Sequence, residues 1–322
     1  MSLPRKRVLV FRELPADQLA RIQRHHDVVV ANPRQQEQVE AFRRALPSAQ
    51  GLIGSSYRIG ADLLASAPLL EVISSISVGV DNYPLPELRA RGIRLCHTPN
   101  VLTETTADML FALVLGTSRR IVELAQYVRR GDWEKNIGPE LFGWDVHGKT
   151  LGILGFGRIG QALAQRAALG FNMRVLYHTR TPVSSSLPAG RVRAATLSEL
   201  LAVSDFIVVV LPLNEQTRGM IGPSEFSAMK PGAILINGAR GPIVQERALL
   251  EALDTGSLRA AGLDVFDTEP LPFDSPLRTH PKVLALPHIG SATHETRYAM
   301  AEMATSNLLL ALDGKDPLAA FL

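Results

Sequence analysis

One short segment, Lys149–Gly160, constrains the fold of this chain more than any other part of the sequence. It reads KTLGILGFGRIG, an unbroken apolar stretch followed by three glycines with the spacing GxGxxG and by a helix-forming run. Gly155 allows a sharp turn, Gly157 lets a phosphate approach the backbone, and Gly160 lets a helix pack closely on the strand. The free N–H groups and positive dipole end of that helix would bind a pyrophosphate. Because a second apolar strand is expected at 173–178, the segment predicts a βαβ unit that binds a dinucleotide.

Short apolar strands alternate with helical segments along the chain, which is typical of parallel α/β sheets. A first series of strands is expected at 7–11, 27–31, 51–54, 71–76 and 93–96. A second series is expected at 150–154, 174–178, 206–211, 233–237, 259–263 and 283–286. Only the second series contains the glycine motif. The sequence therefore predicts an α/β fold with two doubly wound parallel-sheet domains, Rossmann- or flavodoxin-like, and an active-site cleft between them.

The composition argues against several classes of protein. The 322 residues suffice for two domains, and 46% of them are hydrophobic. The formal net charge is +3 and the basic residues are scattered, which argues against a nucleic-acid surface. Cys96 is the only cysteine, so an intrachain disulfide is impossible and a cytoplasmic location is expected. No stretch approaches the ~18 apolar residues of a membrane span. No secretory signal is expected, and neither HExxH nor paired CxxC spacing suggests a metal site.

Three further segments bear on domain organisation and assembly. Apolar residues recur at helical spacing over Thr103–Arg130, which indicates either core helices or a subunit interface. The following loop, Gly131–His147, carries both tryptophans, and aromatic side chains on loops are common at contacts with partners. The last segment, Ala292–Asp313, predicts a helix that is too short to form a domain and should pack on the first domain. The expected domains are a substrate domain, 1–101 with 291–322, and a dinucleotide-binding domain, 102–290.

Candidate catalytic residues follow three strands of the second series. They are Arg240, Asp264, Glu269 and His288, and they should converge because the carboxyl ends of parallel strands form the ligand crevice. Reduction of a carbonyl by a nicotinamide requires a proton, which His288 could supply because an imidazole titrates near pH ~6.5. Glu269 would hold the imidazolium, and Arg240 would polarise the carbonyl and bind a neighbouring carboxylate through two parallel hydrogen bonds.

Each of these residues also has a simpler interpretation when it is taken alone. His288 could be a hydrogen-bonded histidine at a strand end, Arg240 a partner in a surface ion pair, and Glu269 a turn residue before Pro270. Their shared position after strand ends, in a chain that also carries the dinucleotide motif, favours an active site.

The end of the second strand of the βαβ unit indicates which cofactor is preferred. An NAD-binding enzyme usually carries Asp or Glu there, to bind the ribose 2′-hydroxyl. This chain has His178, Thr179 and Arg180 instead. Arg180 and the hydroxyl of Thr179 could bind a 2′-phosphate, although Arg180 could also be a solvated loop residue. The sequence favours NADP(H) over NAD(H).

At these residues the sequence resembles the D-isomer-specific 2-hydroxyacid dehydrogenase family over essentially its whole length. Within that family it is most similar to the glyoxylate/hydroxypyruvate and 2-ketogluconate reductases. The resemblance implies that Arg240, Glu269 and His288 are catalytic. It also implies that Asp264 contacts the nicotinamide amide. Relatives that act on formate carry Gln in place of Glu269, so formate is not expected. The matching segments are Ser77–Asn82, Gly155–Gly160, Asn237–Gly241, Gly262–Pro270 and Pro287–Ser291.

The resemblance assigns further binding residues. The backbone amides of Val78 and Gly79 are expected to hold the substrate carboxylate, with Arg240 and His288 completing the substrate site. Family members are dimers, which favours a homodimer through residues 103–147. The full set of expected cofactor-binding residues is Gly155, Gly157, Arg158, Ile159, Gly160, His178, Thr179, Arg180, Leu211, Pro212, Thr217, Gly238, Ala239, Arg240, Asp264, His288, Gly290 and Ser291.

The expected function is therefore NADPH-dependent reduction of glyoxylate, hydroxypyruvate or 2-ketogluconate to the D-2-hydroxyacid. No nucleic-acid or membrane partner and no metal are expected. An NAD-linked D-2-hydroxyacid dehydrogenase of another substrate remains open. A non-enzymatic, dinucleotide-sensing corepressor is a more distant alternative, because such a protein would not need a complete acid–base pair.

Overall fold

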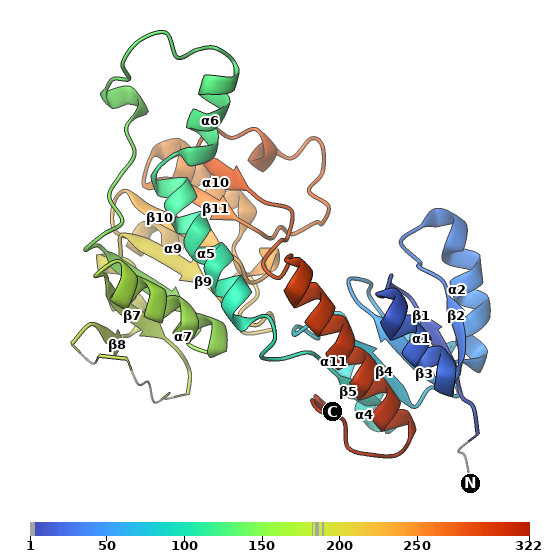
Figure 1. The fold of residues 1–322 in the computed structure, drawn as a ribbon. Coiled ribbons are helices and arrows are strands. Elements are labelled where there is room, and N and C mark those ends of the chain that lie inside the picture. The colour runs from blue at the N-terminus through green and yellow to red at the C-terminus, as the bar shows by residue number, and fades with distance from the viewer. Residues whose placement is uncertain (1–3, 182, 184–186, 189) are drawn as a thin grey trace. The chain divides into compact units, whose positions relative to one another are not determined.

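The computed structural model describes residues 4–181, 183, 187–188 and 190–322 (Figure 1). The chain forms two compact units. Unit 1 comprises Met1–Leu102 and Ala292–Leu322, and unit 2 comprises Thr103–Ser291. The chain therefore passes from one unit to the other twice, after Leu102 and after Ser291.

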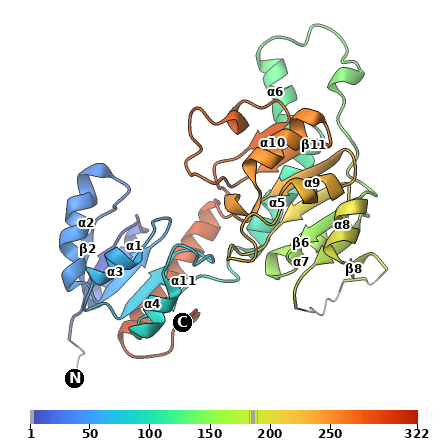
Figure 2. The same cartoon turned by 180° about the vertical axis from the view of Figure 1, so that it is seen from behind.

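Unit 1 contains a parallel sheet in the order β2-β1-β3-β4-β5. Helices α2, α3 and α4 supply Phe42, Leu64 and Leu88 to the core on one face of this sheet, and α1 and α11 cover the other (Figures 1 and 2). The strands are β1 (Arg7–Val10), β2 (Asp27–Val30), β3 (Gly51–Gly54), β4 (Val72–Ser75) and β5 (Arg94–Cys96). The helices are α1 (Ala16–His25), α2 (Val39–Ala45), α3 (Ala61–Ala65), α4 (Leu85–Ala90) and α11 (His294–Leu312), with short 3-10 turns at Gln36–Gln38 and Leu46–Ser48.

Helix α11 completes unit 1 with residues from the far end of the sequence. It packs on β3 and β4, and the buried hydroxyl of Ser74 donates a hydrogen bond of 2.7 Å to the carbonyl oxygen of Ala304. The prediction that the last helix packs on the first domain is confirmed.

Unit 2 contains a parallel sheet in the order β12-β11-β10-β9-β6-β7-β8. Helices α5 and α7 cover one face, and α8, α9 and α10 cover the other (Figures 1 and 2). The strands are β6 (Thr150–Leu154), β7 (Arg174–His178), β8 (Val192–Ala194), β9 (Phe206–Val209), β10 (Ala233–Asn237), β11 (Leu258–Leu263) and β12 (Val283–Ala285). The helices are α5 (Thr103–Ser118), α6 (Ile121–Arg129), α7 (Arg158–Gln165), α8 (Leu197–Val203), α9 (Pro223–Ala228) and α10 (Glu246–Thr255), with a π turn at Arg166–Gly170 and 3-10 turns at Pro139–Leu141, Gly241–Ile243 and Pro276–Arg278.

Both sheets are parallel with helices on both faces, so the predicted fold class is confirmed. All eleven expected strands lie within two residues of their predicted ends. Strand β8 was not predicted, because its three residues Val-Arg-Ala form no apolar run.

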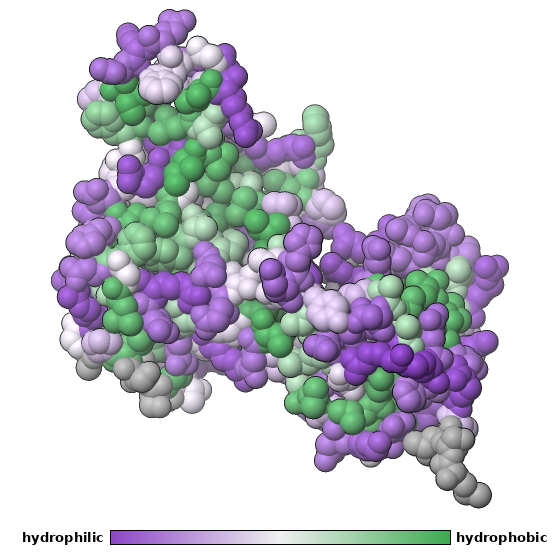
Figure 3. Space-filling model, in the orientation of Figure 1, coloured by the Kyte–Doolittle hydropathy of each residue, from purple (hydrophilic) through white to green (hydrophobic). Residues whose placement is uncertain are grey.

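The segment from Thr103 to Arg130 forms two helices that differ in burial. Helix α5 is buried against the sheet and α7, whereas α6 contains no buried residue. The core interpretation of this segment is therefore correct for α5 and wrong for α6. Figure 3 shows apolar side chains gathered on the surface of α6 and the segment after it. The exposed large apolar residues of this region, named here the arm, are Ile121, Val122, Val128, Trp133, Ile137, Phe142 and Trp144.

No helix in the described part of the chain combines the length and apolar character that a membrane span requires. Among the same residues, no group of three or more His, Cys, Asp or Glu side chains is arranged to hold a metal ion.

Candidate active site

The glycine turn between β6 and α7 has the geometry that a dinucleotide requires. Gly155 has a φ of +101°, and a Cβ atom there would lie 2.8 Å from the carbonyl oxygen of Val210. A Cβ at Gly160 would lie 2.3 Å from the carbonyl oxygen of Gly155, so the helix and the turn approach closely only with glycine. Gly157, in contrast, has no atom within 4 Å of such a Cβ and stands directly before the first helical residue, Arg158. The open backbone at a helix N-terminus fits a pyrophosphate.

The residues at the end of β7 lie where the sequence placed them. His178 is the last residue of β7, and its Nδ1 lies 3.2 Å from the carbonyl oxygen of Ala195. Arg180 is exposed, and its guanidinium donates a hydrogen bond to the side chain of Gln216. The chain thus presents a cation, and no acid, at the position that distinguishes the two dinucleotides.

The loop after β9 carries three of the expected cofactor residues. Leu211 and Pro212 are at least partly exposed, whereas Thr217 is buried. The Thr217 hydroxyl donates a hydrogen bond of 2.7 Å to the carbonyl oxygen of Pro212. Thr217 therefore closes this loop on itself.

The loop after β10 is shaped by Asn237, whose structural role sequence reasoning missed. Its buried side chain accepts a hydrogen bond of 3.1 Å from the backbone N–H of Ala239 and donates one of 3.1 Å to the carbonyl oxygen of Arg240. A Cβ at Gly241 would lie 1.9 Å from the carbonyl carbon of Phe266, so the loop lies directly against that segment. An Asn at a strand end that is followed by glycines is the signal that could have revealed this role.

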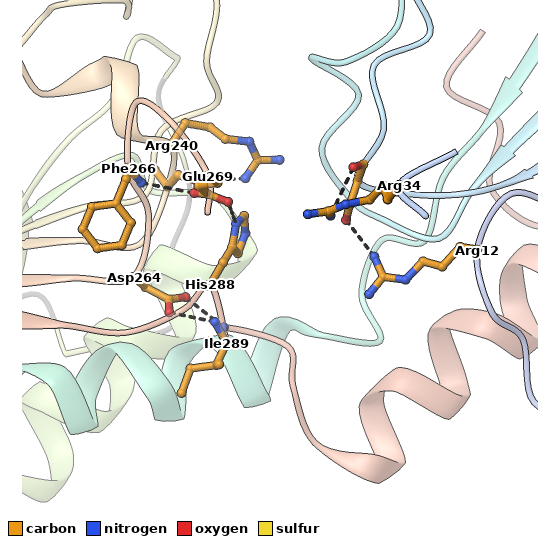
Figure 4. Close-up of polar contacts among 11 residues, drawn as sticks. Arg12, Arg34, Arg240, Asp264, Phe266, Glu269, His288 and Ile289 are labelled. Carbon is orange, nitrogen blue, oxygen red and sulfur yellow. Dashed lines mark hydrogen bonds and ion pairs between the residues drawn. The ribbon is translucent and has the colours of Figure 1, made fainter. Parts of the chain in front are cut away.

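Glu269 and His288 form a hydrogen-bonded pair (Figure 4). His288 Nδ1 and Glu269 Oε2 are 2.7 Å apart, and Glu269 Oε1 accepts a hydrogen bond of 3.1 Å from the backbone N–H of Phe266. Burial alone would raise the pKa of Glu269, but the hydrogen bond and charge of His288, the Phe266 N–H and the charge of Arg240 together lower it. The charge of Arg240 therefore acts on the same carboxylate that holds the imidazole.

Asp264 fixes the segment that carries His288. The side chain of Asp264 is 1% exposed, and its two oxygens accept hydrogen bonds from the backbone N–H groups of Ile289, at 2.7 Å, and Gly290, at 2.9 Å (Figure 4). Burial raises the pKa of Asp264, against the lowering effect of these N–H groups and of His288. His288 itself has a φ of 55°, a conformation that L-residues seldom adopt without such support.

The expected carboxylate-binding loop of unit 1 follows β4. Val78 and Gly79 are partly buried, and Nδ1 of His97 lies 3.1 Å from the carbonyl oxygen of Val78. The backbone N–H of Thr98 donates a hydrogen bond of 2.9 Å to the carbonyl oxygen of Ser77. The segment after β5 therefore supports this loop from one side.

A family model for the NAD-binding domain of D-isomer-specific 2-hydroxyacid dehydrogenases matches residues 111–290. The chain belongs to this family, and it is accordingly an oxidoreductase that uses a nicotinamide dinucleotide. The matched range contains the glycine turn, Arg240, Asp264, Glu269 and His288.

The chain is similar over nearly its whole length to curated relatives. A glyoxylate/hydroxypyruvate reductase B of Citrobacter koseri is 51% identical over 308 residues, which cover 96% of this chain and 95% of the relative. The reductase of the same name from Cronobacter sakazakii is 52% identical over 307 residues, which cover 95% of each chain. The crystal structure of an NADPH-dependent glyoxylate/hydroxypyruvate reductase from Sinorhizobium meliloti, in complex with NADP and malonate, has a TM-score of 0.88 at 32% identity and covers 98% of this chain and 97% of that chain.

Proposed function

We propose that the protein reduces a small 2-ketoacid, such as glyoxylate, hydroxypyruvate or 2-ketogluconate, to the D-2-hydroxyacid with NADPH. The observation that carries the proposal is the pair of His288 and Glu269, at 2.7 Å, on a chain that belongs to a 2-hydroxyacid dehydrogenase family. The names of the relatives support glyoxylate and hydroxypyruvate as substrates.

The chemistry divides among few residues. A bound nicotinamide supplies a hydride to the carbonyl carbon of the substrate. His288 donates its proton to the carbonyl oxygen, which gains negative charge in the reaction. Glu269 remains ionised and stabilises the protonated imidazole. Arg240 binds the substrate carboxylate and polarises the ketone, while the backbone N–H groups of Val78 and Gly79 hold the carboxylate.

A substrate panel tests the proposal. The purified protein is supplied with NADPH and with glyoxylate, hydroxypyruvate or 2-ketogluconate, and cofactor oxidation is followed by absorbance. Turnover of at least one ketoacid, with loss of about 10²–10⁴-fold in kcat in His288→Ala, is expected. Turnover by NADH alone would favour an NAD-linked dehydrogenase. Binding of the dinucleotide without any turnover would contradict the proposal and favour a sensor.

The preference for NADPH is proposed from the end of β7. Arg180 is exposed and held by Gln216, and neither His178 nor Thr179 would repel a 2′-phosphate. Loss of one charged hydrogen bond weakens an interaction roughly 10–150-fold. Arg180→Ala should therefore lower kcat/KM for NADPH by about that factor and leave NADH nearly unchanged. Equal kcat/KM for both cofactors in the parent protein would overturn the preference.

A homodimer through residues 103–147 is proposed as the assembly. The arm exposes Trp133 and Trp144 at 61% and 41%, and no residue of α6 is fully buried within its own chain. Aromatic side chains of this kind are enriched in protein interfaces. Light scattering at micromolar concentration should give about twice the 35.0 kDa of one chain, and a monomer mass would contradict the proposal.

The single buried Cys96 fits a reducing compartment, and we propose a cytoplasmic location.

A further inference from the structure

Unit 1 places basic side chains at one edge of its sheet. Arg34 follows β2, Arg12 follows β1, Ser55 and Ser56 follow β3, and the loop with Gly79 follows β4. All these strands are parallel, so their carboxyl ends lie at the same edge. The strand order reverses between β1 and β3, and in open α/β sheets ligands bind at such a switch point. Arg12 and the two serines flank it.

The guanidinium of Arg12 is fixed across the switch point (Figure 4). Its Nη1 donates hydrogen bonds of 2.7 Å to the hydroxyls of both Ser55 and Ser56. Ser56 has a φ of 59°, and its carbonyl oxygen accepts a hydrogen bond of 3.3 Å from Nη1 of Arg34. Among the residues that the structure describes, Nε and Nη2 of Arg12 have no hydrogen-bond partner. These two donors form an edge that can bind a carboxylate or phosphate bidentately.

The charges around Arg12 favour an anion. Burial, the charge of Arg297 and the charge of Arg34, in that order, lower the pKa of Arg12. A half-buried guanidinium that only formed part of the scaffold would be expected to have a carboxylate partner, because a desolvated charge is costly without one. Within the described part of the chain Arg12 forms no ion pair, and the charges that act on it are positive. An anion bound at the open edge of the Arg12 guanidinium would offset both the desolvation of its charge and the repulsion from the neighbouring arginines.

We propose that Arg12, assisted by Arg34, binds a second anionic group at the far end of the substrate. The enzyme would then select 2-ketoacids that carry a carboxylate or phosphate distant from the ketoacid group. This inference rests on the proposed function, in which Val78 and Gly79 hold the ketoacid carboxylate. The loop that carries them follows β4, two strand spacings, or about 10 Å, from the end of β1. A two-carbon acid does not span that interval, whereas a longer chain with a charged end does.

Paired substrates of equal length test the inference in the full-length enzyme with NADPH. The ratio of kcat/KM for 2-oxoadipate to that for 2-oxohexanoate isolates the terminal carboxylate. The corresponding ratio for 3-phosphohydroxypyruvate and hydroxypyruvate isolates the phosphate and so distinguishes the two kinds of anion. In the parent enzyme at least one ratio should exceed 1, and Arg12→Gln should lower that ratio about 10–150-fold.

Three further variants make the experiment decisive. Arg12→Lys keeps the charge but lacks the bidentate edge, so its ratio should be intermediate. It also serves if Arg12→Gln fails to fold. Arg34→Gln should lower the ratio less than Arg12→Gln does. Arg44→Gln removes the same charge from an exposed position on α2 and should leave the ratio unchanged.

Two negative outcomes have different meanings. If glyoxylate or hydroxypyruvate is reduced but both ratios are the same in the parent and the Arg12 variants, the inference is overturned and the proposed function stands. If no ketoacid is reduced, the proposed function is overturned and the inference with it.

Discussion

Asp264 illustrates how a single buried carboxylate can set the position of a side chain that it does not touch, here the proposed proton donor His288. The Asp264 carboxylate accepts hydrogen bonds from the backbone N–H groups of the two residues that follow His288. It therefore holds the backbone in the conformation that directs the imidazole toward Glu269. The sequence indicated that Asp264 belongs to the site, through its place after β11. It did not indicate this backbone contact, because hydrogen bonds between loops distant in sequence leave no periodic signal.

Asp264→Asn tests this role. The new side-chain NH2 group would face one of the backbone N–H groups that now donate a hydrogen bond to the carboxylate. Because two donors would then face each other, at least one would be unsatisfied, and an unsatisfied buried donor costs about 1–3 kcal/mol. We expect kcat to fall roughly 5–150-fold. Hydrogen exchange at Ile289 and Gly290 should accelerate without cofactor, which separates the backbone role from any contact with the nicotinamide. Asp267→Asn removes the same charge from an exposed neighbouring residue, and it should neither lower kcat nor accelerate hydrogen exchange at Ile289 and Gly290. Unchanged exchange in Asp264→Asn would refute the backbone role.

Glu269→Gln tests the acid–base pair. The amide keeps a hydrogen-bonding group but removes the negative charge that would stabilise a protonated imidazole during proton transfer. The alkaline limb of the pH profile for ketoacid reduction should move to lower pH. The profile must be measured where a deuterated cofactor shows an isotope effect, because only then does chemistry limit the rate. A profile like that of the parent under those conditions would mean that the pair is not the acid–base unit.

The same carboxylate should leave a signature in stability. Since the pKa of Glu269 is lowered in the folded protein, against its burial, the unfolded state binds the proton more readily. Its contribution is fully present above the ordinary value of 4.5 and is lost as the pH falls through the lowered pKa. Urea unfolding at several pH values should show the stability difference between parent and Glu269→Gln shrinking below pH 4.5. A difference that grows on acidification would contradict this sign.

Arg240→Lys tests geometry rather than charge. The ammonium is a point charge and cannot make the two parallel bonds of a guanidinium. We expect kcat/KM for the ketoacid to fall strongly while NADPH affinity is kept, as measured by steady-state kinetics and cofactor titration. Activity near that of the parent would show that a bidentate contact is not needed.

At the scale of the elements, strands with an apolar run were predictable, whether central or at an edge, and the edge strand β8 without such a run was not. The apolar runs of β6 and β10 are buried throughout, so hydrophobicity alone locates them. Strand β8 lies at the sheet edge with one buried residue and gave no such signal. Helix α5 is apolar around most of its circumference and is buried, whereas α6 has one apolar face, which is largely exposed. Sequence periodicity identifies an apolar face but not what covers it.

Helix α11 offers a test at this scale. Leu308 is fully buried, and a Cβ at Gly51 in β3 would lie 3.0 Å from its side chain. Leu308→Ala should destabilise unit 1 by about 2–5 kcal/mol, because deletion of buried methyl groups leaves a cavity. Glu302→Ala, at an exposed position of the same helix, should change stability by less than about 0.5 kcal/mol. Urea unfolding measures both, and equal effects would mean that α11 does not pack as described.

At the scale of the whole molecule, the two units differ in continuity. Unit 2 is one uninterrupted stretch, Thr103–Ser291, whereas unit 1 needs residues from both ends of the chain. A fragment of residues 103–291 should therefore unfold cooperatively on its own. A fragment of residues 1–102 should not, because without α11 the apolar face of β3 and β4 is exposed. Circular dichroism during thermal unfolding measures both, and a cooperative transition in the shorter fragment would contradict the expectation.

The discontinuity of unit 1 also bears on how the protein is made. A ribosome that adds ~5–20 residues per second needs about 10–40 s to synthesise Thr103–Ser291 after Leu102 has been added. Throughout that interval the N-terminal part of unit 1 is outside or leaving the ribosome without α11, one of the helices that cover its sheet. Unit 2, although encoded later, can complete its fold first. The nascent chain therefore carries a partly uncovered β-sheet, the kind of surface that chaperones bind, until α11 emerges.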